Sequence, residues 1–74
     1  YGTVTSYART IIIGNNVTVS ELVVKGGDIR VKRGSHTKKI VIESRNTVRL
    51  YYEDGASFPT DFPNDKVIIV YGDN

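Results

Sequence analysis

The sequence predicts an all-β fold, a small antiparallel barrel or sandwich of about six strands. Three segments each run an apolar triplet into a short polar turn and out again as an alternating strand: TIIIGNNVTV at 10–19, ELVVKGGDIRV at 21–31 and KIVIESRNTVRL at 39–50. These segments are rich in β-branched residues, and no long stretch shows a helical period. The turns are short and rich in Gly and Asn, which is typical of antiparallel hairpins.

We expect strands near residues 9–13, 17–24, 28–33, 38–43, 47–53 and 66–71. Residues 9–74 then form a single β domain, and residues 1–8 form an N-terminal arm or an edge strand. A loop at 54–65 carries two prolines and two phenylalanines and is too long for a hairpin. We expect its two Phe rings to pack over an open end of the core.

Alternation assigns side chains to faces of these strands. One phase holds the expected core residues Val17, Val19, Ile29, Val31, Ile40, Ile42, Val48 and Leu50. Leu22 and Val24 are offset by one position, which predicts a bulge near Ser20 and Glu21. The opposite phase is also apolar at five positions, Ile12, Val23, Val41, Ile68 and Val70. In a sheet with one solvent-exposed face, the residues on that face should be polar. We therefore predict that a barrel, a sandwich or self-association covers these five residues.

A short parallel β-solenoid is the alternative architecture, because phrases such as NVTVSELVVKGGDIRV resemble successive coils of such a fold. The offset that aligns Val17 with Ile40 also aligns Leu22 with Arg45, which does not fit. At that offset the chain holds two coils at most, fewer than a solenoid usually needs. The antiparallel fold is therefore the main prediction.

Charge is divided unevenly along the chain. Residues 25–49 hold eight basic and two acidic residues, a net charge of +6, whereas residues 51–74 hold one basic and five acidic residues, a net charge of −4. Alternation predicts a basic stripe on the sheet, made of Arg30, Lys32, Lys39 and Arg49 beside Tyr51. Such a stripe suits a polyanion, either nucleic acid or a sulfated glycan, and equally suits a solvated face that protects strand edges.

Catalysis has little support in the sequence. The chain has 74 residues and no cysteine, which excludes disulfides and cysteine-rich zinc sites and leaves little interior for a pocket. His36, the single histidine, lies in the expected turn 34–37, and the spacing of Asp54, Asp61 and Asp65 matches no EF-hand. We predict no enzyme activity, no metal and no cofactor. The longest apolar runs are too short to span a membrane, so we predict no membrane insertion.

The leading hypothesis is a non-enzymatic structural or interaction module that forms a homo-oligomer, such as a virion component or an extracellular appendage subunit. Two observations support self-association: the five apolar residues in the opposite phase of the strands, and the separation of basic from acidic residues along the chain. Asn16-Val17-Thr18 matches the N-glycosylation acceptor pattern, which favours an extracellular or virion-surface location while leaving localisation open. The alternative function is a polyanion-binding module that uses the basic stripe.

Overall fold

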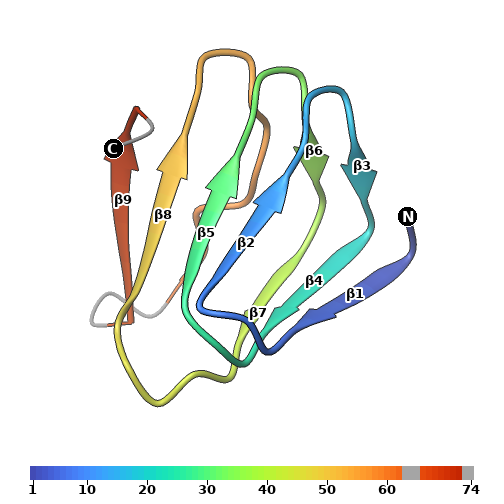
Figure 1. Ribbon diagram of the computed structural model, residues 1–74. Helices are drawn as coiled ribbons and strands as arrows, with labels where there is room; N and C mark the ends of the chain where they lie inside the picture. The colour runs from blue at the N-terminus through green and yellow to red at the C-terminus, as the bar shows by residue number, and fades with distance from the viewer. Residues whose placement is uncertain (63–65, 73–74) are drawn as a thin grey trace.

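The computed structural model describes residues 1–62 and 66–72, and these residues form strands and turns without any helix. Its strands are β1 (Thr3–Ser6), β2 (Thr10–Ile13), β3 (Thr18–Val19), β4 (Glu21–Val24), β5 (Asp28–Val31), β6 (His36–Thr37), β7 (Ile40–Ile42), β8 (Val48–Tyr52) and β9 (Val67–Tyr71) (Figure 1). The all-β prediction is confirmed. No helix in this described part could cross a membrane.

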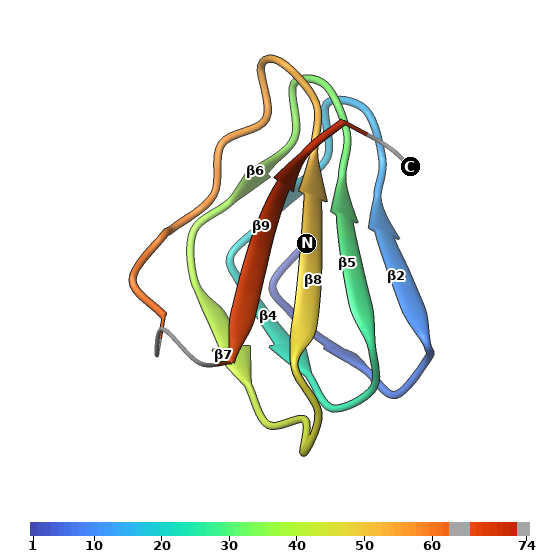
Figure 2. The same cartoon turned by 90° about the vertical axis from the view of Figure 1, so that its left-hand side faces the viewer.

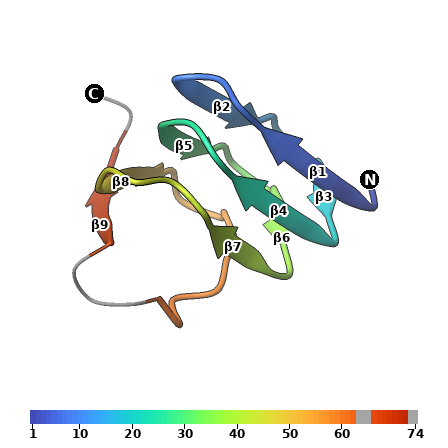
Figure 3. The same ribbon diagram turned by 90° about the horizontal axis from the view of Figure 1, so that it is seen from below.

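The strands form three sheets, and every strand pair is parallel. Sheet A has the order β1-β4-β7, sheet B the order β2-β5-β8-β9, and sheet C the order β3-β6. The four strands of sheet B run side by side in the same direction in Figure 2, and Figure 3 shows the strands of sheet A beside one another. The first two turns of the chain each contribute one strand to each sheet in succession, which makes the fold a short β-solenoid.

The repeat of the solenoid is shorter than the offset tested on the sequence, and it changes along the chain. In sheet A, Thr3 pairs with Glu21 and Leu22 pairs with Ile40, so the two steps between coils are equal. In sheet B the step from the second coil to the third is longer, since Ile29 pairs with Leu50. The first coil comprises β1 to β3, the second β4 to β6, and the third begins with β7 and β8. Strand β9 then adds a fourth strand to sheet B.

The predicted antiparallel barrel or sandwich is therefore wrong, and the alternative, a short parallel β-solenoid, is confirmed. The expected hairpin turns are corners that carry the chain from one sheet to the next. The expected single strand 17–24 consists of β3 and β4 in different sheets, so the one-residue offset near Ser20 is a corner and no bulge. The expected turn 34–37 contains β6.

Two kinds of corner hold the coils in register. At one corner Asn16 and Gly34 both have positive φ, 61° and 76°, and stack on each other, with the Asn16 N–H donating to the carbonyl of Arg33 at 3.1 Å. Gly34 in turn donates its N–H to Gly55, which has a φ of 83°. At another corner Gly26 lies against the carbonyl of Ala8, where a Cβ would overlap that oxygen. Left-handed backbone and close approach explain why glycine occupies these positions.

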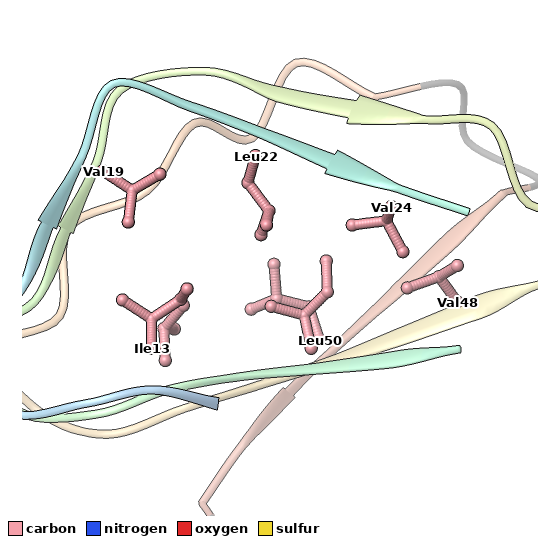
Figure 4. Close-up of a cluster of buried hydrophobic side chains, with 8 residues drawn as sticks. Ile13, Val19, Leu22, Val24, Val48 and Leu50 are labelled. Carbon is pink, nitrogen blue, oxygen red and sulfur yellow. The ribbon is translucent and has the colours of Figure 1, made fainter. Parts of the chain in front are cut away.

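The core runs along the axis of the solenoid. Among the described residues, eight apolar side chains are buried: Ile13, Val19, Leu22, Val24, Ile29, Val31, Val48 and Leu50. The labelled members point into the space between the sheets, from β2 and β8 on one side and from β3 and β4 on the others (Figure 4). Seven of these eight were assigned to the inner phase or to its one-position offset by alternation along the strands, and alternation therefore found the core correctly.

The first and last segments have different roles at the two ends of the stack. Strand β1, in the region expected to be an arm or an edge strand, pairs with β4 and forms one edge of sheet A. Residues 58–62 run past sheet A next to β7 (Figures 2 and 3). Phe58 and Phe62 pack against the core, as expected for the Pro- and Phe-containing loop, and the Phe58 ring centroid lies 5.3 Å from that of Tyr52.

Candidate functional site

The open N-terminal end of the solenoid is the most distinctive surface of the molecule. It forms an apolar hollow of about 300 Å³ lined by Tyr1, Val4, Ile11, Ile12, Ile13, Gly14, Val17 and Val19. In the described part of the chain, β1, β2 and β3 each pair with one strand only, on the side of the second coil. Their other edges present backbone N–H and C=O groups that no strand satisfies, although the Tyr1 ammonium donates to the carbonyl of Thr18 on β3 at 2.6 Å. This end combines an apolar floor with a rim of hydrogen-bonding groups.

The two edge strands of sheet B are apolar on their outer face. Ile12 on β2 is 58% exposed, and Ile68 on β9 is 50% exposed. The sequences of these two strands, TIII and VIIVY, contain no charged residue and no proline. Native proteins commonly protect free edges with lysine, proline or a covering segment. Among the described residues, both free edges of sheet B lack these protections.

The five predicted self-association residues lie on two faces. Ile12, Ile68 and Val70 belong to sheet B, whereas Val23 and Val41 pair with each other in sheet A. Val23, Val41 and Val70 are half-buried. The chain itself therefore leaves Ile12 and Ile68 uncovered, and these two lie at opposite ends of one sheet.

The predicted basic stripe is divided between two faces. Arg30 and Tyr51 are neighbours on the outer face of sheet B, with the Arg30 guanidinium carbon 4.5 Å from the Tyr51 ring centroid. Arg49 lies on the next row of the same face, and its backbone N–H donates to an Asp28 carboxylate oxygen at 3.2 Å. Lys39 lies beside sheet A, and its Nζ is 3.7 Å from a Glu21 carboxylate oxygen.

Carboxylates accompany other lysines of the basic segment. Lys32 Nζ lies 3.7 Å from Glu53 Oε2, and Lys25 Nζ lies 3.4 Å from Glu43 Oε1. Each of these ion pairs joins the second coil to the third, and pairs of this exposure contribute about 0–1 kcal/mol each. Part of the positive charge of the stripe is thus neutralised by carboxylates of the same chain, which weakens the electrostatic attraction of the stripe for a polyanion.

The residues weighed for catalysis or metal binding are separated. The His36 side chain is exposed on β6, and the backbone N–H of His36 donates to the carbonyl of Val17 at 2.8 Å. Asp54 accepts a hydrogen bond from the Tyr71 hydroxyl at 2.9 Å, Asp61 is exposed, and Asp65 lies outside the described residues. Within residues 1–62 and 66–72, no three acidic or histidine side chains gather as a metal site would require.

The hydrogen bond to Asp54 also changes the acidity of Tyr71. That bond, together with the negative charge of Asp54, raises the pKa of Tyr71 above its ordinary value of 10.0. The Tyr71 ring lies edge-on to Tyr52, with ring centroids 5.3 Å apart. These contacts connect the end of β9 to the third coil.

Two buried hydroxyls escaped the sequence analysis. Ser35 Oγ and Thr37 Oγ1 lie inside the solenoid without a hydrogen-bond partner among the described residues. Thr37 is the neighbour of Val19 in sheet C, so the interior at this corner changes from apolar to polar between the first and second coils. The sequence carried a signal for this, the alternation of Ser35 and Thr37 around His36, which the expected turn concealed.

Comparisons with protein-family models, with curated proteins and with solved structures found no match. The solenoid is defined by its own strand pairing. The function must therefore be inferred from the surfaces of this chain. The open N-terminal end and the edges of sheet B expose apolar side chains and backbone groups that no described strand pairs with.

Proposed function

We propose that the protein is a non-enzymatic structural module that associates with copies of itself through the ends of its solenoid. The open N-terminal end carries this proposal, because it joins an apolar hollow to three strand edges without partners among the described strands. A solenoid coil buries its inner side chains only when another coil lies against it, and for that reason repeat proteins usually need capping segments at their ends. The first coil has no such segment in the part of the chain that the structure describes.

Self-association would pair the exposed backbone groups with those of another copy and would bury the exposed apolar side chains. A strand added to β2 would satisfy its free N–H and C=O groups, and the apolar side chains of that strand would cover the hollow. Burying a side chain such as Ile12 contributes about 1.5–3 kcal/mol when it is complete. We extend the proposal to a subunit of a virion or an extracellular appendage, supported only by the absence of cysteine and the Asn16-Val17-Thr18 sequence.

The mass in solution tests this proposal. We expect sedimentation analysis to show masses above that of one chain, 8.2 kDa, and to show them rising with protein concentration. An Ile12→Lys variant should shift the distribution toward the single chain, since lysine on a free edge opposes strand addition. Thr47→Lys is the matched control, because Thr47 is exposed at a corner of the third coil and the charge change is the same. A wild-type chain that stays monomeric at high micromolar concentration, in low and in high salt, contradicts the proposal.

A polyanion-binding module is the second candidate, and one observation favours it. Arg30 is held on the ring of Tyr51, with Arg49 on the neighbouring row, so two guanidinium groups share the outer face of sheet B. Titration with heparin and with single-stranded DNA in low salt should then show binding that weakens as salt rises. Arg30→Gln with Arg49→Gln should abolish that binding, whereas Lys39→Gln on the other face should preserve it. Absence of salt-sensitive binding to both polymers removes this candidate.

A further inference from the structure

We infer that copies of this chain stack head to tail, with β2 of one copy adding in parallel to β9 of the next. This inference rests on the proposed self-association and specifies its partner surface and its polarity. Strands β2 and β9 are the two edges of sheet B, and they lie at opposite sides of the row of four strands in Figure 2. A junction between them would continue one sheet from copy to copy.

The directions of the free backbone groups are complementary. The N–H of Lys32 donates to the carbonyl of Ile13, and the N–H of Asp28 donates to the carbonyl of Arg9. In a parallel ladder, alternate residues face opposite neighbours. The N–H and C=O of Thr10 and Ile12 therefore point to the open edge of β2.

The same reasoning applies to β9. The carbonyl of Lys66 accepts from the N–H of Val48, and the N–H of Gly72 donates to the carbonyl of Tyr52. The backbone groups of Val67, Ile69 and Tyr71 therefore point to the open edge of β9. A parallel junction can form with the N–H of Ile69 donating to Thr10 of the next copy, and with the N–H of Ile12 of that copy donating to the carbonyl of Ile69.

This hydrogen-bond register also aligns the side chains correctly. Ile11, Ile29, Leu50 and Ile69 form one column in sheet B, and the junction continues it by bringing Ile69 against Ile11 of the next copy. Ile69 is 41% exposed although its column faces the core, which reflects the lack of a further coil on β9 among the described residues. On the outer face the junction brings Val70 beside Ile12. The exposed outer isoleucine of β2 would thus gain an apolar neighbour.

Sheet A offers no such matched pair of edges in the described part of the chain. In sheet A the N-terminal edge is the polar strand TVTS of β1, and residues 58–62 beside β7 form no strand and include Pro59. Proline lacks the N–H that a ladder needs, and it commonly blunts the edge of a sheet. Sheet B is therefore the sheet through which the stack would grow.

Charge along the solenoid axis favours the same polarity. Residues 1–20, which form the first coil, hold one charged side chain, that of Arg9, a net charge of +1. The described residues 40–62 and 66–72 hold three basic and four acidic residues, a net charge of −1. Stacking head to tail brings opposite charges together, whereas joining two N-terminal ends brings like charges together. Salt should therefore weaken the junction.

Complementation between end-blocked variants tests the polarity. Ile12→Pro removes the edge-facing N–H of β2, and Ile69→Pro removes that of β9, without removing a donor to an existing strand pair. Each variant alone should be monomeric, because each retains only one usable end. Mixing the two should produce a 1:1 dimer and nothing larger, while the wild type should form stacks without a fixed size, as an open head-to-tail contact predicts.

Three outcomes would overturn the inference, and they are distinguishable. If Ile69→Pro alone still dimerises while Ile12→Pro does not, two N-terminal ends meet each other, and self-association survives without this polarity. If both variants stay monomeric even when mixed, the β2–β9 junction is wrong. If the wild type itself is monomeric, the proposed function fails. Ile12→Lys and Ile68→Lys, both at exposed positions, repeat the test should circular dichroism show that a proline variant is unfolded.

Discussion

The two ends of this solenoid differ in how far the chain itself covers the core. At the C-terminal end, residues 58–62 pass beside β7, and Phe58 and Phe62 pack against the core. At the N-terminal end, the first coil leaves an apolar hollow of about 300 Å³ open among the described residues. A solenoid has no edge-free form, so each end must be covered by its own chain or by another molecule. The difference indicates that the C-terminal end is covered beside sheet A, whereas the two edges of sheet B, β2 and β9, remain without a strand partner among the described residues.

The largest expected effect comes from removing the C-terminal cover. Phe58→Ala should lower the free energy of unfolding by about 3 kcal/mol, the low end for a phenylalanine because this ring is only partly buried. Urea denaturation in dilute solution measures this change. Ile12→Ala, at the open end, should cost less than about 0.5 kcal/mol under the same conditions. Equal losses for the two variants would mean that the two ends are equally covered in the single chain.

The next effect concerns the corner that joins the open coil to the second one. Gly34 has a φ of 76° beneath Asn16, so Gly34→Ala should destabilise the chain by about 1–3 kcal/mol. Asn16→Gly, at a φ of 61° in the same stack, should change stability by less than about 1 kcal/mol, because glycine adopts this backbone freely. Thermal unfolding of both variants checks this, and a harmless Gly34→Ala would refute the role given to the left-handed corner.

A smaller effect should come from the polar interior of the second coil. Thr37→Val keeps the shape of the side chain and removes a buried hydroxyl that has no partner among the described residues, so we expect stability to rise by about 1 kcal/mol. Thr18→Val on the neighbouring strand is the control, because Thr18 is exposed and should give no comparable gain. A loss of stability in Thr37→Val would show that its hydroxyl is hydrogen-bonded in solution.

The smallest effect is a pH dependence at β9. The hydrogen bond to Asp54 and its charge raise the pKa of Tyr71 in the folded chain above 10.0, so the folded state holds this proton more tightly than the unfolded state. The stabilisation is complete below pH 10 and is lost as the pH rises through the raised pKa. Denaturation curves of Tyr71→Phe should fall less steeply over this alkaline range than those of the wild type. Parallel curves for both proteins would contradict this role for Tyr71.

Alternation along the strands predicted the core well but left the strand pairing open. Val24, Ile29 and Leu50 are buried as the pattern predicts, since period-two alternation holds for parallel and antiparallel strands alike. A turn such as Lys25-Gly26-Gly27 can close a hairpin or form a corner between sheets. Its glycines are required by the close approach of the preceding coil, at Ala8 for Gly26 and at Arg9 for Gly27, contacts that one segment of sequence does not reveal.

The solenoid repeat was present in the sequence but was obscured by a change of length. One offset aligns Ile11 with Ile29 and also Leu22 with Ile40, whereas a longer offset is needed to align Ile29 with Leu50. A single fixed offset therefore fails, because the corner before β8 is longer than the corner before β5. The candidate surfaces were predicted only in part, since Ile12 and Ile68 were expected to be covered by a barrel, a sandwich or self-association, and their places on opposite edges depend on the strand order.

The similar spacing between paired strands has a consequence for how the chain opens. Each paired strand of sheets A and B contacts strands about one coil away in the sequence. In these sheets each coil is therefore stabilised by contacts with its neighbouring coils. Opening can then begin at an end without disturbing the middle. The amide hydrogens of β1 should exchange with solvent faster than those of β5 and β8, and a bound neighbour would slow exchange first at the open coil.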